Sequence, residues 1–200
     1  MDSSIGIRVL RGIAVAIAVN PDGPTPSFAG RAQLLLSDPK IASTLRPFHA
    51  MARLPREKAQ PMVERDEAIV RRAASTSMRS FVSQLTAAGM HPLCAAIVSD
   101  GDPEMRVSNA HLEAHALERR LFREATASAA RECGIQAVFL EEAEVTRDAA
   151  KIVGVSTSAL DTWLAQIGVA AGRPWRAEEK TAAAVSWITS MSSAKHRSTR

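Results

Sequence analysis

The sequence predicts an α/β fold in which helices flank a mixed β-sheet. Two short apolar runs bounded by turn residues, 93–99 (L-C-A-A-I-V-S) and 135–140 (I-Q-A-V-F-L), are typical of central strands covered on both faces. Segments 62–88 and 108–133 carry apolar residues at helical spacing. The alternation of strand and helix indicates parallel central strands joined by right-handed connections.

The segment before the first long helix predicts a β-hairpin and an irregular connection. In residues 5–20, Val and Ile alternate with Ala, which predicts one strand or two strands broken at Gly12. A turn cluster follows, and residues 27–37 are the expected hairpin partner. Residues 38–61 contain several prolines, so we expect an irregular surface segment with one short helix near 41–45.

Composition restricts the class of protein. The formal net charge is +4, and Lys195, Arg197 and Arg200 place three of these charges in the last nine residues. We therefore expect a nearly neutral domain over residues 1–191, helical from 143 to 191, and a disordered basic tail at 192–200. Aromatic residues are only 4% of the chain, which argues against binding single-stranded nucleic acid by rows of stacked rings.

The sequence gives no sign of a membrane protein or a disulfide framework. Its apolar run at 12–19 is too short to span a bilayer. Cys94 and Cys133 have no metal-ligand spacing and are expected to be buried, reduced thiols. We therefore predict a cytoplasmic protein that does not contact a membrane.

Helix 108–133 carries the best candidate site. Its predicted inward-facing stripe consists of His111, His115, Glu118, Phe122, Ala125, Ala129 and Cys133. The polar members lie at the helix N-terminus, beside a loop with Asp100 and Asp102 that follows a predicted strand. In an open α/β sheet, ligands usually bind where such a loop meets the next helix.

Two interpretations of this polar cluster compete. Histidines at positions i and i+4, here His111 and His115, can place two imidazoles around one metal ion, with Glu118 on the same face. The alternative is a structural cluster, hydrogen-bonded to the loop that carries Asp100 and Asp102. We favour the structural interpretation because no third histidine is nearby in the sequence. It predicts that His115 is mostly buried and has a visible hydrogen-bond partner.

Residues 143–169 resemble a bacterial helix-turn-helix. Gly154 stands in the predicted turn, and Ser156 is placed to cap the second helix. In a DNA-binding protein Ser156, Thr157 and Ser158 would face nucleic acid, but this second helix contains neither Lys nor Arg. We therefore favour a helix pair packed on the domain, with Leu160, Trp163 or Leu164 pointing inward.

The last predicted helix begins near Pro174, which we place in its first turn. Its expected inner face consists of Ala177, Thr181, Ala184, Val185, Ile188 and Met191. Trp175 and Trp187 are the expected packing anchors.

Taken in order, these elements resemble an RNase H-like domain of the Holliday-junction-resolvase type. The resemblance rests on an N-terminal hairpin, a long helix, a central strand ending in an acid, and a closing helix with acids in its first turn. It implies a three-layer fold in which clustered carboxylates hold two divalent metals, Mg²⁺ or Mn²⁺, for phosphodiester cleavage. Asp100 matches the central-strand acid, and Glu178 and Glu179 match the closing-helix acids; Asp100 and Glu179 would be metal ligands.

The first strand departs from this pattern because residues 7–19 contain no carboxylate. The resemblance therefore predicts a catalytically degenerate domain without a cofactor, which acts in binding or assembly with nucleic acid or a protein. Two alternatives remain at this stage. One is an active Mg²⁺- or Mn²⁺-dependent nuclease or phosphodiesterase, and the other is a helix-turn-helix DNA-binding regulator.

Overall fold

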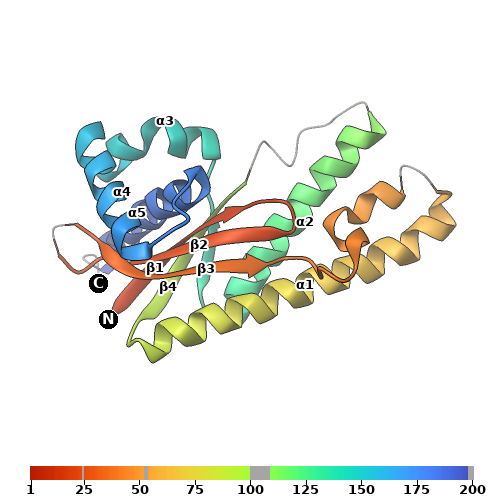
Figure 1. Cartoon of the computed structure of the whole chain (residues 1–200), viewed down its shortest axis with the longest axis horizontal. Helices are drawn as coiled ribbons and strands as arrows, with labels where there is room; N and C mark the ends of the chain where they lie inside the picture. The colour runs from red at the N-terminus through yellow and green to blue at the C-terminus, as the bar shows by residue number, and fades with distance from the viewer. Residues whose placement is uncertain (24, 52–53, 100–108, 198–200) are drawn as a thin grey trace.

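The strands form one mixed sheet. The computed structural model describes residues 1–23, 25–51, 54–99 and 109–197 (Figure 1). The strands are β1 Asp2–Val9, β2 Ile13–Asn20, β3 Ser27–Leu35, β4 His91–Ser99 and β5 Gln136–Phe139. Their order is β3-β2-β1-β4-β5, with β1, β4 and β5 parallel and with β2 antiparallel to both β1 and β3.

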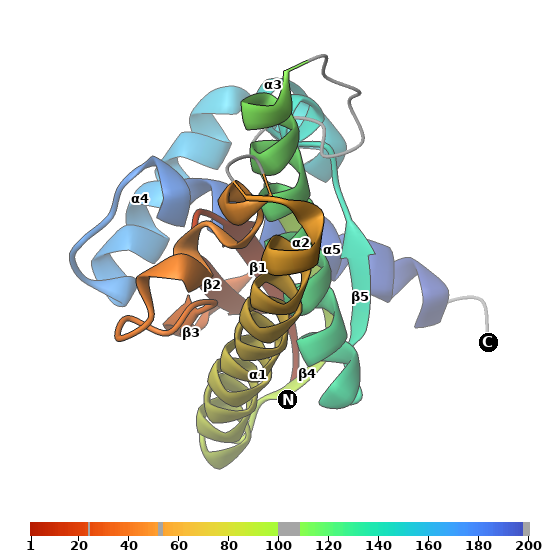
Figure 2. The same ribbon diagram turned by 90° about the vertical axis from the view of Figure 1, so that its right-hand side faces the viewer.

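Helices cover both faces of this sheet and make three layers (Figures 1 and 2). The α-helices are α1 Arg56–Ala87, α2 Ala110–Glu132, α3 Glu142–Val153, α4 Thr157–Ala171 and α5 Ala177–Arg197. Two short 3-10 helices, η1 Ala42–Leu45 and η2 Pro47–Ala50, precede α1. One apolar core joins the sheet to α1 and α2, and a second joins it to α3, α4 and α5. The predicted α/β fold class is confirmed.

Strand β1 shows how alternation builds the two cores. Ile5 and Ile7 belong to the core beneath α1 and α2. Ser4 and Gly6 face α5: the hydroxyls of Ser4 and Ser186 donate to each other's backbone carbonyls at 2.8 and 2.9 Å. A Cβ at Gly6 would overlap the backbone of α5 at Ala182 and Ser186. The missing side chain therefore lets α5 lie directly on the sheet.

The N-terminal expectations are largely confirmed, with a break at Gly12. This residue has φ +71° and joins β1 to β2 as a hairpin, so residues 5–20 are two strands. Helix α1 begins at Arg56 rather than at Met62, and Pro61 lies inside it. Proline lacks the N–H of one helical hydrogen bond. Ala59 and Val63, which flank Pro61, are both buried, and this burial explains why α1 continues through the proline.

Two further expectations are corrected by packing. Residues 135–140 are predicted by the sequence to form a central strand. They instead form the short strand β5 at the edge of the sheet, and β1 occupies the centre beside β4. The final helix begins at Ala177 rather than near Pro174, which follows a cis peptide bond. Ala177 is exposed, whereas residues 182–190 are all buried. Residues 182–190 are buried all round the helix because α5 lies between the sheet on one side and α3 and α4 on the other. It therefore has no single inner face.

The expected tail boundary at residue 192 stays a prediction; the backbone of α5 continues to Arg197. Among the described helices, none combines the length and the apolar character that crossing a membrane requires.

Candidate functional site

The acids that the resemblance singles out do not form a described metal cluster. Asp100 and Asp102 lie outside the described residues, so the predicted convergence of Asp100 with Glu178 and Glu179 stays a prediction. Glu178 is half-buried in the first turn of α5, and its neighbour Glu179 is 5% exposed.

Both carboxylate oxygens of Glu179 have protein partners. Its Oε2 accepts the backbone N–H of Arg176 at 2.8 Å, which satisfies a donor at the start of α5. Its Oε1 lies 3.3 Å from Nη2 of Arg31, and this guanidinium also donates to the carbonyl of Pro174 at 2.8 Å. Glu179 therefore caps α5 and ties its first turn to β3.

A buried arginine stands on β1, the strand that lacks the expected acid. The side chain of Arg8 is 7% exposed, and its Nη2 lies 2.7 Å from Oε1 of Glu142, the first residue of α3. Glu142 is thus neutralised, as Glu179 is by Arg31. A two-metal site needs carboxylate oxygens that are available to dications, whereas a buried guanidinium repels them. The described residues do not fit the resolvase-type metal pair.

A different polar cluster lies beside the N-terminal end of α2. His49 from η2 meets His111 and His115 from α2, and the three ring centroids are 4.6–5.1 Å apart. One ring nitrogen from each lies within 4.8 Å of those of the other two. We call these three residues the histidine cluster. The sequence interpretation assumed that no third histidine was near, and His49 shows that this assumption was wrong.

Glu118 lies behind the histidine cluster and is 2% exposed. Its Oε1 is 2.7 Å from Nδ1 of His49, and its Oε2 is 3.2 Å from Nδ1 of His115. The prediction of a mostly buried His115 with a hydrogen-bond partner agrees with the structure, since its side chain is 20% exposed and its partner is His111. The expected hydrogen bonds to the loop with Asp100 and Asp102 lie outside the described residues.

The other ring nitrogens of His111 and His115 face each other. Nε2 of His115 lies 3.3 Å from Nε2 of His111. Nε2 of His49 is buried and has no hydrogen-bond partner among the described residues. Burial lowers the pKa of His115 below its ordinary value, the charges of His49, His111 and Arg11 act in the same direction, and Glu118 opposes them. His115 is therefore favoured as a neutral imidazole at neutral pH.

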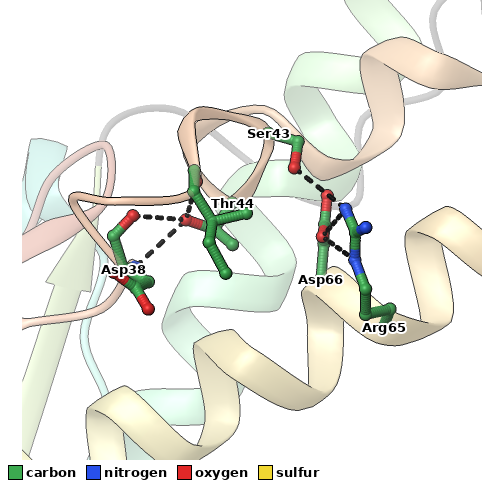
Figure 3. Close-up of polar contacts among 6 residues, drawn as sticks. Asp38, Ser43, Thr44, Arg65 and Asp66 are labelled. Carbon is green, nitrogen blue, oxygen red and sulfur yellow. Dashed lines mark hydrogen bonds and ion pairs between the residues drawn. The ribbon is translucent and has the colours of Figure 1, made fainter.

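The connection that precedes His49 is held by polar contacts around Ser43 and Thr44 (Figure 3). Thr44 is fully buried, and its hydroxyl accepts the N–H of Asp38 at 3.0 Å and donates to the carbonyls of Ile41 and Asp38. Arg65 of α1 donates to the hydroxyl of Ser43 at 3.2 Å. These contacts fix η1, and η2 packs against α1 and α2.

The N-terminus of α2 fixes the other two histidines. The side chain of Asn109 accepts the backbone N–H of His111 at 2.8 Å and caps the helix. Arg11, in the turn between β1 and β2, lies close enough for its charge to act on His115. The histidine cluster therefore lies near the carboxyl ends of the parallel strands β1 and β4. This is where open α/β sheets usually bind ligands.

The helix pair at residues 143–169 has the predicted elements. Gly154 adopts a left-handed conformation between α3 and α4, and Ser156 caps α4 by accepting the N–H of Ala159 at 3.1 Å. Leu160 and Trp163 are buried as expected, and Nε1 of Trp163 donates to the carbonyl of Pro26. Residues 156–158 are exposed. A contact of Ser156, Thr157 and Ser158 with nucleic acid stays a prediction.

The strand order and the three layers define an RNase H-like fold. Among solved structures, the chain is similar to Thermus thermophilus RuvC, at TM-score 0.56 and 11% identity over 97% of this chain and 96% of that one. It is also similar to T. thermophilus RuvC in complex with Holliday junction substrate, at TM-score 0.53 and 12% identity over 93% of this chain and 91% of that one. No protein-family model and no curated protein sequence matches the chain. These identities show a shared fold, which confirms the predicted architecture.

Sequence reasoning missed His49 because it lies in an irregular segment, 69 residues before Glu118. Periodicity relates residues on one helix and gives no information about a loop that packs against it. The sequence shows that β1 lacks the acid that the resemblance expects. It does not show that Arg8 on this strand pairs with Glu142.

Proposed function

We propose that this RNase H-like domain binds nucleic acid and does not cut it at the resolvase-type position. The observation that carries the proposal is the buried pair of Arg8 and Glu142. It places a cation on β1, on the side of the sheet that α5 covers. Phosphodiester cleavage by two metals needs anionic ligands there, and the guanidinium supplies the opposite charge.

Nucleic acid is the preferred partner for two reasons. A structural neighbour of the same fold was solved with a Holliday junction. Exposed cations also occur in the turn after β1 and in the segments beside η2: Arg11 in the β1–β2 turn, Arg46 directly before η2, and Arg56 and Lys58 at the start of α1. Such side chains contact phosphates and position a domain without reading sequence.

The test uses the purified full chain with a labelled four-way junction, a duplex of the same sequence and a single strand. We expect salt-sensitive binding in EDTA and no strand cleavage when Mg²⁺ or Mn²⁺ is added. Replacing Arg11 and Arg46 together with Gln should reduce the slope of log K against log salt by about 2, because each lost phosphate contact removes about 0.9.

The matched control is Arg79→Gln. Arg79 is exposed on α1, and its charge acts on Cys133 at the far end of α2, away from the proposed surface. This variant should keep the wild-type salt slope. Metal-dependent cleavage that Glu179→Gln abolishes would establish an active nuclease instead. Absence of binding to all three probes would favour a protein partner.

A further inference from the structure

We propose that His49, His111 and His115 form a binding site for a divalent transition metal of the zinc class, with Glu118 as the carboxylate that orients two of the ligands. The site is independent of the proposed nucleic-acid binding. It is built from two elements far apart in the sequence, η2 and the first turns of α2.

The first support is the position of the ring nitrogens. Zinc binds imidazole nitrogen at about 2.0–2.1 Å, so two nitrogens at a tetrahedral angle lie roughly 3.4 Å apart. The Nε2 atoms of His111 and His115 are 3.3 Å apart. A ring nitrogen of His49 lies within 4.8 Å of the other two ligand atoms. A small closure of η2 toward α2 would therefore complete the three-nitrogen geometry.

The second support is the set of atoms behind the rings. A metal-bound histidine usually donates its other ring N–H to a carboxylate, which fixes the tautomer and the ring orientation. Glu118 lies 2.7 Å from Nδ1 of His49 and 3.2 Å from Nδ1 of His115. If both Nδ1 atoms carry their proton toward this carboxylate, both Nε2 atoms keep a lone pair that can bind a metal.

The third support is an atom that a metal-free hydrogen-bond network leaves unexplained. Without a metal, His111 can donate from Nε2 to His115, and His49 can donate from Nδ1 to Oε1 of Glu118, whose Oε2 is buried without a hydrogen bond among the described residues. Nε2 of His49 then remains buried with no partner among the described residues. A buried polar atom without a partner costs stability, and a metal ion would use this lone pair.

Charge also favours a cation at this position. Glu118 is 2% exposed, and its ion-pair partners in the described part of the chain are the two imidazoles. A dication held by the same rings would balance this buried carboxylate. Three nitrogen ligands and no carboxylate ligand favour Zn²⁺ or Co²⁺ over Mg²⁺. Three protein ligands are also the number found in zinc sites that keep one position open for water.

The test starts from the full chain, stripped of metal with a chelator and free of affinity tags. We expect one Zn²⁺ per chain by elemental analysis after dialysis against zinc. Co²⁺ should produce the visible absorption of a four-coordinate nitrogen site. The melting temperature should rise by about 5–10 °C at a zinc concentration near 100 times Kd, and Mg²⁺ should cause no such rise.

His111→Ala is the decisive variant because His111 is exposed, so its loss should not disturb folding. We expect it to weaken zinc binding by more than about 100-fold, as His49→Ala should. Glu118→Gln should weaken zinc binding by about 10–100-fold, which is the usual effect of removing a group that hydrogen-bonds to a metal ligand. The melting temperature without metal shows whether each variant is folded.

The matched control is His91→Ala, since His91 is an exposed histidine at the start of β4, the opposite end of that strand from the cluster. It should keep wild-type zinc affinity and stoichiometry. A wild-type chain that binds no stoichiometric zinc, or a folded His111→Ala chain that binds zinc as tightly as wild type, would overturn the proposal. Neither result would affect the proposed nucleic-acid binding, which is measured in EDTA.

Discussion

The two polar clusters beside the sheet use their carboxylates differently. On the α5 side, Glu142 is paired with Arg8, and Glu179 with Arg31. Near the N-terminal end of α2, Glu118 is paired with His49 and His115. An arginine is always charged, so each of these pairs neutralises its carboxylate. A neutral imidazole that donates to a carboxylate still has a lone pair on its other nitrogen.

This difference separates a structural use of buried charge from the metal-binding use that we propose for the histidine cluster. The arginine pairs connect α3 to β1 and α5 to β3, and they engage the carboxylates of Glu142 and Glu179. The histidine cluster holds ligand atoms toward one another. The shared fold with RuvC therefore does not imply a shared catalytic position, and the metal site that we propose is on the other side of the sheet.

The largest expected effect comes from the close approach of α5 to the sheet. Gly6→Ala should reduce the free energy of unfolding by more than about 4 kcal/mol, because the new Cβ overlaps backbone atoms of Ala182 and Ser186 that cannot rotate away. Urea denaturation followed by circular dichroism measures it. The matched control is Gly30→Ala on β3, where the nearest atom is the end of the Leu85 side chain.

Because that side chain can move, Gly30→Ala should cost only about 1–2 kcal/mol. Equal losses for Gly6→Ala and Gly30→Ala would mean that α5 adjusts as easily as a side chain does. The sheet face that α5 covers would then be no more rigid than the face that α1 covers.

The next effect tests the structural role of the arginine pair. Arg8→Ala should reduce the free energy of unfolding by about 2–4 kcal/mol, since it removes a buried side chain and leaves Glu142 without this partner, although Glu142 is 25% exposed and water offsets part of the loss. Thermal and urea unfolding measure it. Arg147→Ala removes the exposed pair with Asp148 on α3 and should change stability by less than about 0.5 kcal/mol. If the two variants lose the same amount, the pair of Arg8 is no more than a surface contact.

The smallest effect concerns the connection that positions His49. Thr44→Val should cost about 1–3 kcal/mol, because the N–H of Asp38 loses its acceptor at a fully buried position. It should also weaken zinc binding, which isothermal titration calorimetry would show. Ser43→Ala removes a single bond from Arg65 and should leave both quantities near wild type. Unchanged zinc affinity in Thr44→Val would show that η2 is positioned without η1.

The sequence by itself determined the architecture where the signal is local. The apolar run 93–99 predicted the central strand β4, and helical spacing predicted α2 and most of α1. The missing acid on β1 was also visible, because a departure from a family pattern needs only the residue at that position. These features depend on periodicity of 2 or 3.6 residues, which a short window contains.

Tertiary structure decided the partners across elements. It placed β5 at the edge and β1 in the centre, paired Arg8 with Glu142, and brought His49 to two histidines of α2. The physical reason is that such contacts depend on how segments far apart in the chain pack, and periodicity within one segment does not constrain this. Two histidines on one helix were readable from spacing, but the third ligand of the proposed zinc site required the fold.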